Sequence, residues 1–291
     1  AGRPHRQMCD TRSARVGSSA VDLNLSGRRG DMPVYVAEPD GPAPWPGVLV
    51  VSDALGMTTD LRNQADWLAG AGFLAAAPDL FYWGGRMRCL FTTMRQALSG
   101  EGDVFTDFET MRQWLVGHEA STGKVGVVGF CLGGGFALAL AGSGGYQAAS
   151  SNYGGLTKKA LAGLAQSCPM VGSYGALDRG LKKEPEQISA VLEAQGISYD
   201  MKVYPDAGHS FMNDHIESEV PKWAVIMGKL SKSDYHESSA MDARRRITSF
   251  FTEHLAQPRP AGVPRGQRGC GVRRDPGQEL TAIRSGLTPI L

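Results

Sequence analysis

Residues 124–141, KVGVVGFCLGGGFALALA, decide the fold. A β-branched run ends at Val128, the pentapeptide GFCLG follows at 129–133, and small apolar residues then continue at a spacing that suits a buried helix. We therefore predict a strand, a sharp turn and a helix. The pattern of a nucleophile with glycines two positions before and after it is typical of a nucleophile elbow, here with cysteine where serine is commoner.

The two glycines of this pentapeptide have a steric reason. The backbone of an elbow nucleophile is strained and the turn is tight, so a Cβ at Gly129 or Gly133 is expected to collide with the adjacent strand or helix. A free cysteine in apolar surroundings is most often a small, inert core residue. Such a residue, however, needs neither the glycines nor a strand and a helix on either side. We therefore interpret Cys131 as a nucleophile that projects from the top of a sheet.

Strand and helix patterns alternate along the rest of the chain. Apolar runs or alternation predict strands at 21–37 (a hairpin broken at 27–31), 47–51, 73–77, 148–153, 170–174 and 198–204. Helical spacing predicts helices at 59–71, 87–97, 105–116, 185–194 and 239–255. This order predicts an α/β fold class: a mostly parallel central sheet with helices on both faces, as a single domain over residues 20–256.

Composition narrows the class of partner. The 291 residues are 42% hydrophobic and 20% charged, enough to bury a large core. A net charge of +1 provides no field for nucleic acid or acidic membranes, and no run of about 18 apolar residues is present to span a bilayer. We expect a small-molecule substrate, no nucleic-acid or membrane partner, no cofactor, and a monomer or small homo-oligomer.

The cysteines and the two ends of the chain carry further expectations. The five cysteines show no C-x-x-C pair and no Cys/His zinc spacing, which predicts a reducing, cytoplasmic location and no metal site. Residues 1–19 contain arginines but no apolar core of a secretory signal, so we expect a disordered extension. Residues 257–291 are rich in Pro, Gly and Arg without apolar periodicity, which predicts a disordered, solvated tail.

A thiol nucleophile needs a base that takes its proton and a carboxylate that orients the base. Asp178 follows the strand predicted at 170–174, and His209 follows the strand predicted at 198–204. Both therefore lie at the carboxyl edge of a parallel sheet, where sites are built. The chain order of nucleophile, acid and histidine matches the order expected for α/β-hydrolases.

Three other residues are alternatives for these roles. Asp206 lies three residues before His209, and we expect it to form the turn that presents this histidine. His118 falls at a helix end before the elbow strand, and His215 comes after its loop has left the sheet edge. We expect both of these histidines to lie at the surface.

Stabilising the oxyanion requires two backbone donors aimed at the developing charge. The first candidate is the N–H of Leu132, the residue after the nucleophile, at a helix N-terminus whose dipole also favours a thiolate. The second is the N–H of Ala54, in the loop that follows the strand predicted at 47–51. The alternative for this loop is an ordinary connection that caps the next helix.

Several segments together resemble the dienelactone hydrolase family of α/β-hydrolases. They are GFCLGG at 129–134, APDLF at 77–81, AGHSF at 207–211 and the loop around Asp178. The resemblance covers most of residues 20–256 and implies an α/β-hydrolase fold. It also implies hydrolysis of an enol-lactone or related ester through an acyl-thioenzyme. The family's cysteine, aspartate and histidine map onto Cys131, Asp178 and His209.

Two departures from the family pattern concern substrate and resting state. A family glutamate that holds the resting thiol is matched here by Asp53, which is one methylene shorter. The family's substrate-binding arginine after AGHSF is replaced by the sequence MND at 212–214. The candidates to replace this arginine are Arg86, Arg88 and Arg95. The candidates to line an apolar pocket are Phe81, Tyr82, Trp83 and Phe211.

Two alternative functions stay open from sequence. One is a general short-chain esterase or thioesterase that uses the same site. The other is a catalytically silent module that binds a ligand or partner and carries Cys131 as a redox-responsive thiol.

Overall fold

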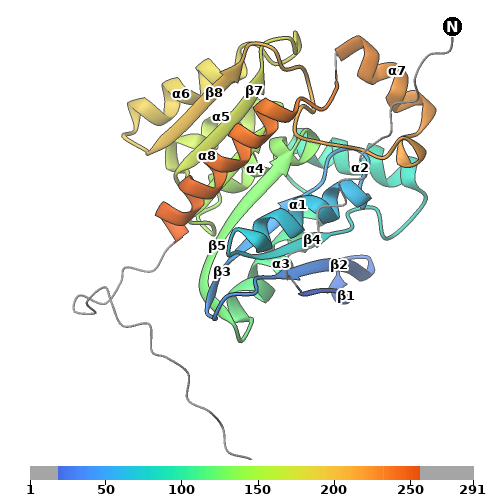
Figure 1. The fold of residues 1–291 in the computed structure, drawn as a ribbon, viewed down its shortest axis with the longest axis vertical. Helices are drawn as coiled ribbons and strands as arrows, with labels where there is room; N and C mark the ends of the chain where they lie inside the picture. The colour runs from blue at the N-terminus through green and yellow to red at the C-terminus, as the bar shows by residue number, and fades with distance from the viewer. Residues whose placement is uncertain (1–18, 232, 256–291) are drawn as a thin grey trace, which may run out of the picture. The chain divides into compact units, whose positions relative to one another are not determined.

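The computed structural model describes residues 19–231 and 233–255 (Figure 1). Apart from Ser19, the extensions predicted at both ends lie outside the described residues. The strands are β1 Ser19–Gly27, β2 Gly30–Glu38, β3 Trp45–Val51, β4 Leu74–Pro78, β5 Ser121–Phe130, β6 Ala148–Asn152, β7 Met170–Gly175 and β8 Tyr199–Tyr204. The helices are α1 Thr59–Gly70, α2 Arg86–Ser99, α3 Asp103–Gly117, α4 Leu132–Ala141, α5 Lys158–Gly163, α6 Glu184–Ala194, α7 Lys222–Ser231 and α8 Glu237–Leu255, with short 3₁₀ turns at Leu164–Gln166 and Glu217–Glu219.

The strands form one sheet in the order β1-β2-β4-β3-β5-β6-β7-β8. The hairpin β1–β2 adds to β4 in antiparallel fashion, and every pairing from β4 through β8 is parallel. The predicted mostly parallel sheet and its opening hairpin are therefore confirmed. Because the parallel strands end at one edge, the loops that follow β3, β5, β7 and β8 lie near one another.

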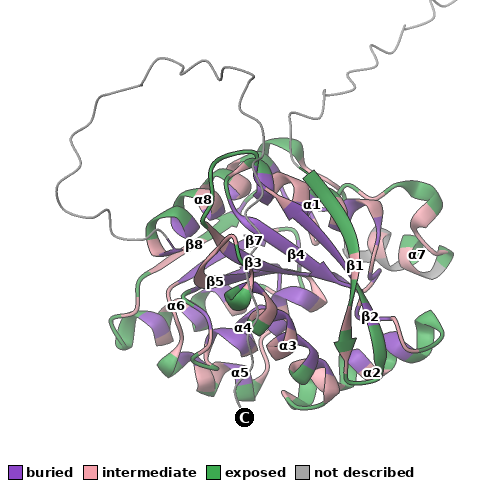
Figure 2. Cartoon of the chain, turned by 90° about the horizontal axis from the view of Figure 1, so that it is seen from below, coloured by how far each residue is buried: buried purple, intermediate pink, exposed green. Residues whose placement is uncertain are grey.

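Helices cover both faces of the sheet, as Figure 2 shows. Alternate residues of β3 enter different cores: Val48 and Val50 pack with α1 and α8, whereas Leu49 and Val51 pack with α3, α4 and α6. A parallel strand buried on both faces needs apolar side chains at every position, which is the reason for the continuous apolar run in its sequence.

Two helices were not expected from sequence. Helix α5 has six residues, too few to show a helical period. Helix α7 leaves Val225 and Ile226 exposed, so these two apolar residues do not mark a buried face. Helix α7 follows the segment that carries His209 and His215, and it forms one wall of the cavity described below.

The elbow is built as its sequence predicts. Strand β5 ends at Phe130, helix α4 begins at Leu132, and Cys131 between them has φ 53° and ψ −111°. A Cβ on Gly129 would lie 1.9 Å from the carbonyl oxygen of Gly133, and one on Gly133 would lie 2.2 Å from the carbonyl oxygen of Val51. Backbone atoms cannot move aside as side chains can, so both positions require glycine.

Replacing Gly129 by alanine is expected to lower the free energy of unfolding by more than about 3 kcal/mol, because the added methyl overlaps backbone on the opposite side of the turn. Chemical denaturation measures the loss. Gly70→Ala is the matched control, since a Cβ there meets no atom within 4 Å. Equal stability of the two variants would contradict the steric argument.

Candidate active site

The structure brings three of the predicted residues together at the carboxyl edge of the sheet. Cys131 lies in the elbow, Asp178 in the loop after β7, and His209 in the loop after β8. His209 Nε2 lies 3.0 Å from Cys131 Sγ, and His209 Nδ1 lies 2.6 Å from Asp178 Oδ2. The imidazole therefore bridges a thiol and a buried carboxylate, the arrangement that orients a base toward a nucleophile.

The two loops that carry the acid and the base are held locally. The Gly180 N–H donates to the second carboxylate oxygen of Asp178 at 3.0 Å, and the Leu177 N–H donates to the Ala207 carbonyl at 3.0 Å. The ring of Tyr153, at the end of β6, meets the imidazole of His209 edge-on with ring centroids 5.4 Å apart. These contacts leave the imidazole little freedom to rotate.

The negative charges of Cys131 and Asp178 favour the protonated form of His209. Burial lowers the pKa of His209, but the negative charge of Cys131 and the hydrogen bond to Asp178 outweigh burial and raise it to about 10. Burial raises the pKa of Asp178, but the hydrogen bond and positive charge of His209 leave it below its ordinary value. An imidazolium beside sulfur is the condition that favours a reactive thiolate.

A second histidine–carboxylate pair shares the cavity with Cys131. His215 Nε2 lies 2.7 Å from Asp53 Oδ2, and the Leu55 N–H donates to Asp53 Oδ1 at 2.8 Å. The expectation that His215 is a surface histidine is therefore wrong: its side chain is 16% exposed, because the segment after His209 turns back across the end of β3. Both oxygens of Asp53 are occupied by these two donors.

A buried network of hydrogen bonds holds the segment between His209 and His215. The Tyr153 hydroxyl donates to Asn213 Oδ1 at 2.6 Å, and Asn213 Nδ2 donates to Asp60 Oδ2 at 2.6 Å. Asp60 Oδ1 also accepts the Asp214 N–H at 2.8 Å. Burial raises the pKa of Asp60, although these donors oppose the rise. Asn213, which occupies the stretch where the family resemblance implied an arginine, is thus a buried structural link.

Sequence reasoning had no signal for Asp60 and Tyr153. Asp60 has the position of an ordinary acidic residue in the first turn of α1, and Tyr153 follows a strand without any motif. The functional interest of both comes from contacts between segments far apart in the chain.

Cys131 opens into a cavity of about 720 Å³. Its described wall contains one apolar side formed by Leu181, Val220, Ala224 and Val225, with the ring of Tyr235 nearby. The ionisable groups of the described wall, besides Cys131 and Tyr235, are Asp53, Asp178, Asp214, Glu217, Asp234, His209 and His215. No lysine or arginine stands among these described lining residues. Ala54 lines the cavity too, and Leu132 opens the helix that follows Cys131.

The residues predicted to bind substrate lie elsewhere. Phe211 is fully buried and packs against Tyr153 and Tyr204. Phe81 is buried in the core, and the Tyr82 hydroxyl donates to Asp107 Oδ2 at 3.1 Å. None of the three belongs to the described wall of the Cys131 cavity.

The predicted arginines and Trp83 also lie away from the described wall of the Cys131 cavity. The guanidinium of Arg29 lies 4.0 Å from the centre of the Trp83 ring, and that of Arg88 lies 5.7 Å from it. Arg86 donates to the carbonyl of Leu55. Arg95 is exposed on α2. These cations therefore lie outside the described wall of the Cys131 cavity. A substrate carboxylate bound in that cavity would need a cation in this wall.

The remaining alternatives are also placed. His118, at the end of α3, lies 3.7 Å from Glu38, and because its side chain is only 18% exposed the expectation of a surface histidine is wrong here too. Asp206 is exposed in the turn before His209. Within residues 19–231 and 233–255, no cluster of three or more His, Cys, Asp or Glu is arranged to hold a metal ion. No helix in this same part of the chain is long and apolar enough to cross a membrane.

Comparison with known proteins agrees with this architecture. The sheet order and the elbow define the α/β-hydrolase fold, which the solved dienelactone hydrolases share. Residues 32–255 match the model of the dienelactone hydrolase family, and the chain belongs to that family. Its homologues indicate a hydrolase.

Individual relatives are distant. A carboxymethylenebutenolidase of Pseudomonas putida is 29% identical over 222 residues, which are 72% of this chain and 86% of that protein. A dienelactone hydrolase from Anabaena variabilis, 17% identical, superposes with a TM-score of 0.59 over 82% of this chain and 99% of that one. The dienelactone hydrolase-like promiscuous phosphotriesterase P91 from metagenomic libraries, 19% identical, gives 0.65 over the same shares. At these identities the two structures show a shared fold.

The protonation of His209 is measurable by NMR. We expect its imidazole to titrate near pH 10, and Cys131→Ala to lower that pKa because the variant removes a negative charge 3.0 Å away. Since the folded pKa lies above that of the unfolded chain, the associated stability is fully present below about pH 6.5 and is lost as pH rises toward 10. A pKa that does not change in the variant would contradict the charge coupling.

Proposed function

We propose that this protein hydrolyses a carboxylic ester or lactone through a Cys-His-Asp triad and an acyl-thioenzyme. The observation that carries the proposal is the single line of contacts from Asp178 through His209 to Cys131. Membership of the dienelactone hydrolase family supports the reaction class. The raised pKa of His209 supports a protonated imidazole beside the sulfur of Cys131.

The chemistry then proceeds in two halves. The sulfur of Cys131 forms a bond to the carbonyl carbon, the carbon–oxygen bond to the leaving group breaks, and the imidazolium of His209 gives its proton to the departing oxygen. Neutral His209 then takes a proton from water, and the resulting hydroxide attacks the thioester. The C–S bond breaks, the acid product leaves, and the thiolate is restored beside imidazolium. Asp178 keeps the imidazole in the required orientation throughout.

The negative charge on the carbonyl oxygen requires donors. We assign this role to the N–H groups of Leu132 and Ala54. The N–H of Leu132 belongs to the first turn of α4, where backbone donors have no acceptor within the helix and the dipole favours negative charge. Ala54 lines the same cavity as Cys131, in the loop that follows β3. A proper oxyanion donor contributes about 10²–10³ in rate.

The residues that line the cavity favour an uncharged substrate. The cavity's apolar side and acidic groups suit an uncharged small ester with a short acyl chain, which makes a general short-chain esterase the second candidate function. Free thiols at Cys89, Cys131 and Cys168 support the proposed cytoplasmic location.

His209→Ala is expected to lower turnover of an aryl ester by at least about 10²-fold, because the general acid and base is lost. Cys131→Ala should abolish acyl-enzyme formation, followed as the initial burst of released phenol. His118→Ala is the matched control, since this histidine pairs with Glu38 outside the cavity. Undiminished turnover in His209→Ala would refute the triad. A thiol at Cys131 that iodoacetamide labels stoichiometrically, without hydrolysis of any ester or lactone, would instead favour a silent binding module.

Substrate charge provides the second test. We expect kcat/KM for 4-nitrophenyl butyrate to exceed that for 4-nitrophenyl hemisuccinate by about tenfold or more, because the second substrate brings a carboxylate among carboxylates. Raising the salt concentration should narrow the difference by screening. A preference for the anionic ester would point back to a dienelactone-like substrate.

A further inference from the structure

The loop that supplies the second oxyanion donor is tied to the loop that supplies the histidine. Residues 52–56 follow β3, and Asp53 within them bonds His215, six positions after His209. The same carboxylate accepts the Leu55 N–H, which closes a tight turn around Ala54. One side chain thus shapes the turn and fastens it to a distant segment.

The two side chains that make this contact, Asp53 and His215, are both largely buried. The side chain of Asp53 is 8% exposed and that of His215 is 16% exposed. In the described contacts Asp53 accepts from Leu55 and pairs with His215, whereas the thiol of Cys131 meets His209. The residue at the position of the family's thiol-holding glutamate therefore has a different partner in this chain.

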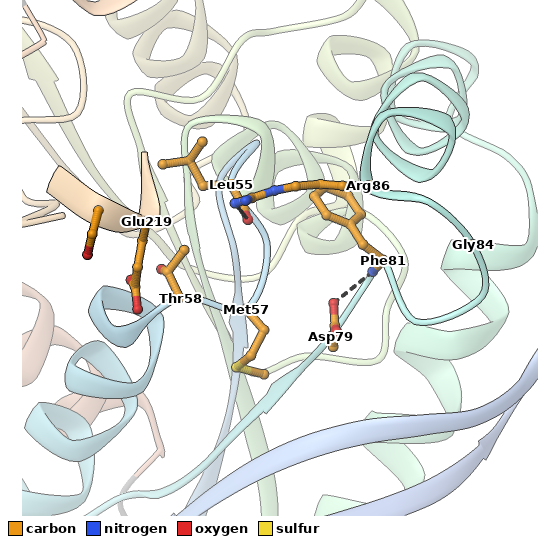
Figure 3. Close-up of a pocket in the computed structure, with 9 residues that line it drawn as sticks. Leu55, Met57, Thr58, Asp79, Phe81, Gly84, Arg86 and Glu219 are labelled. Atoms are coloured by element: carbon orange, nitrogen blue, oxygen red, sulfur yellow. Dashed lines mark hydrogen bonds between the residues drawn. The ribbon is translucent and has the colours of Figure 1, made fainter. Parts of the chain in front are cut away.

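Other contacts hold the same loop from outside. Figure 3 shows the side chain of Arg86, from the start of α2, extending toward Leu55. The guanidinium of Arg86 donates a hydrogen bond to the carbonyl oxygen of Leu55. Glu219 bonds both the N–H of Thr59 at 2.9 Å and its hydroxyl at 2.6 Å, at the start of α1. Arg86 therefore holds the loop at Leu55, and Glu219 holds the start of α1, whereas the contact between Asp53 and His215 is made on the other side of Ala54.

We propose that His215 is a positioning residue, which through Asp53 holds the Ala54 N–H where negative charge develops on the carbonyl oxygen. This inference rests on the proposed ester hydrolysis. It adds a role for a histidine that touches neither Cys131 nor Asp178 in the described contacts, and it links the oxyanion donor to the loop of the catalytic base.

The electrostatics of the pair agree with this role. Burial lowers the pKa of His215, but the hydrogen bond and charge of Asp53, followed by the charges of Asp60 and Glu219, raise it above its ordinary value. The positive charge of His215 therefore persists to higher pH than that of an unperturbed imidazole and is lost as pH rises through the raised pKa. Asp60 is bonded by Asn213, and Glu219 by Thr59, so neither replaces Asp53 as the direct partner.

The test compares kcat with the reactivity of the thiol. His215→Ala should lower kcat by about 10- to 100-fold with little change in KM, because the donor acts on the transition state and not on the bound ester. Alkylation of Cys131 by iodoacetamide needs no oxyanion donor, so its rate should stay within about twofold of wild type. Peptide mapping separates this site from the other four of the five cysteines.

Matched variants exclude a general loss of structure. His215→Gln keeps an N–H donor near the position of Nε2 and should recover most of the lost kcat. Asp53→Asn retains an acceptor for the Leu55 N–H but loses the charge, and it should reproduce the loss seen in His215→Ala. The double variant of Asp53→Asn and His215→Ala should be no slower than the worse single one, because both break the same interaction.

Amide hydrogen exchange gives a readout independent of hydrolysis. The Leu55 amide should exchange faster in His215→Ala and in Asp53→Asn, since the turn that this amide closes is then no longer fastened to residue 215 and opens more often. Unchanged exchange together with unchanged kcat would overturn the proposal, as would alkylation that slows in parallel with kcat. Should His215→Ala fail to fold, Asp53→Asn decides by the same criteria. If wild type cleaves no ester, the proposed function fails, and the exchange experiment still decides whether His215 holds the loop.

Discussion

The backbone at the elbow passes so close to its neighbours that only glycine fits at two positions, and the site depends on this approach. A Cβ at Gly133 would overlap the carbonyl of Val51, the last residue of β3. The same approach brings the first turn of α4 beside the loop that begins at Ser52. The nucleophile and the two proposed oxyanion donors therefore share one small volume because two strand ends are in backbone contact.

A single segment after β8 then completes the arrangement. His209 and His215 both lie on it, and each pairs with a carboxylate from a different strand end: Asp178 after β7 and Asp53 after β3. Asn213 between them is held by Tyr153 and by the first turn of α1. A displacement of this segment would therefore alter the base and the proposed oxyanion loop together, which makes it the coupling element of the site.

The elbow could be predicted in detail because its sequence pattern is compact. The glycine spacing, the β-branched run and the small-residue helix lie within residues 124–141, although the backbone that excludes a side chain at Gly133 belongs to Val51 on β3. The order of strands and helices followed from the same kind of local periodicity. His215 was misjudged because nothing local shows that its segment returns to the end of β3.

The predicted substrate residues illustrate the same limit. Phe81, Tyr82 and Phe211 have the chemistry of a pocket lining, but their side chains point into packing contacts, a direction that periodicity does not reveal. By itself the sequence determined the fold class, the elbow and the chain order of cysteine, aspartate and histidine. Only the tertiary structure decided which carboxylate pairs with which histidine and which side chains face the cavity, because those choices arise from contacts between separate segments of the chain, 162 positions apart for Asp53 and His215 and 31 for Asp178 and His209.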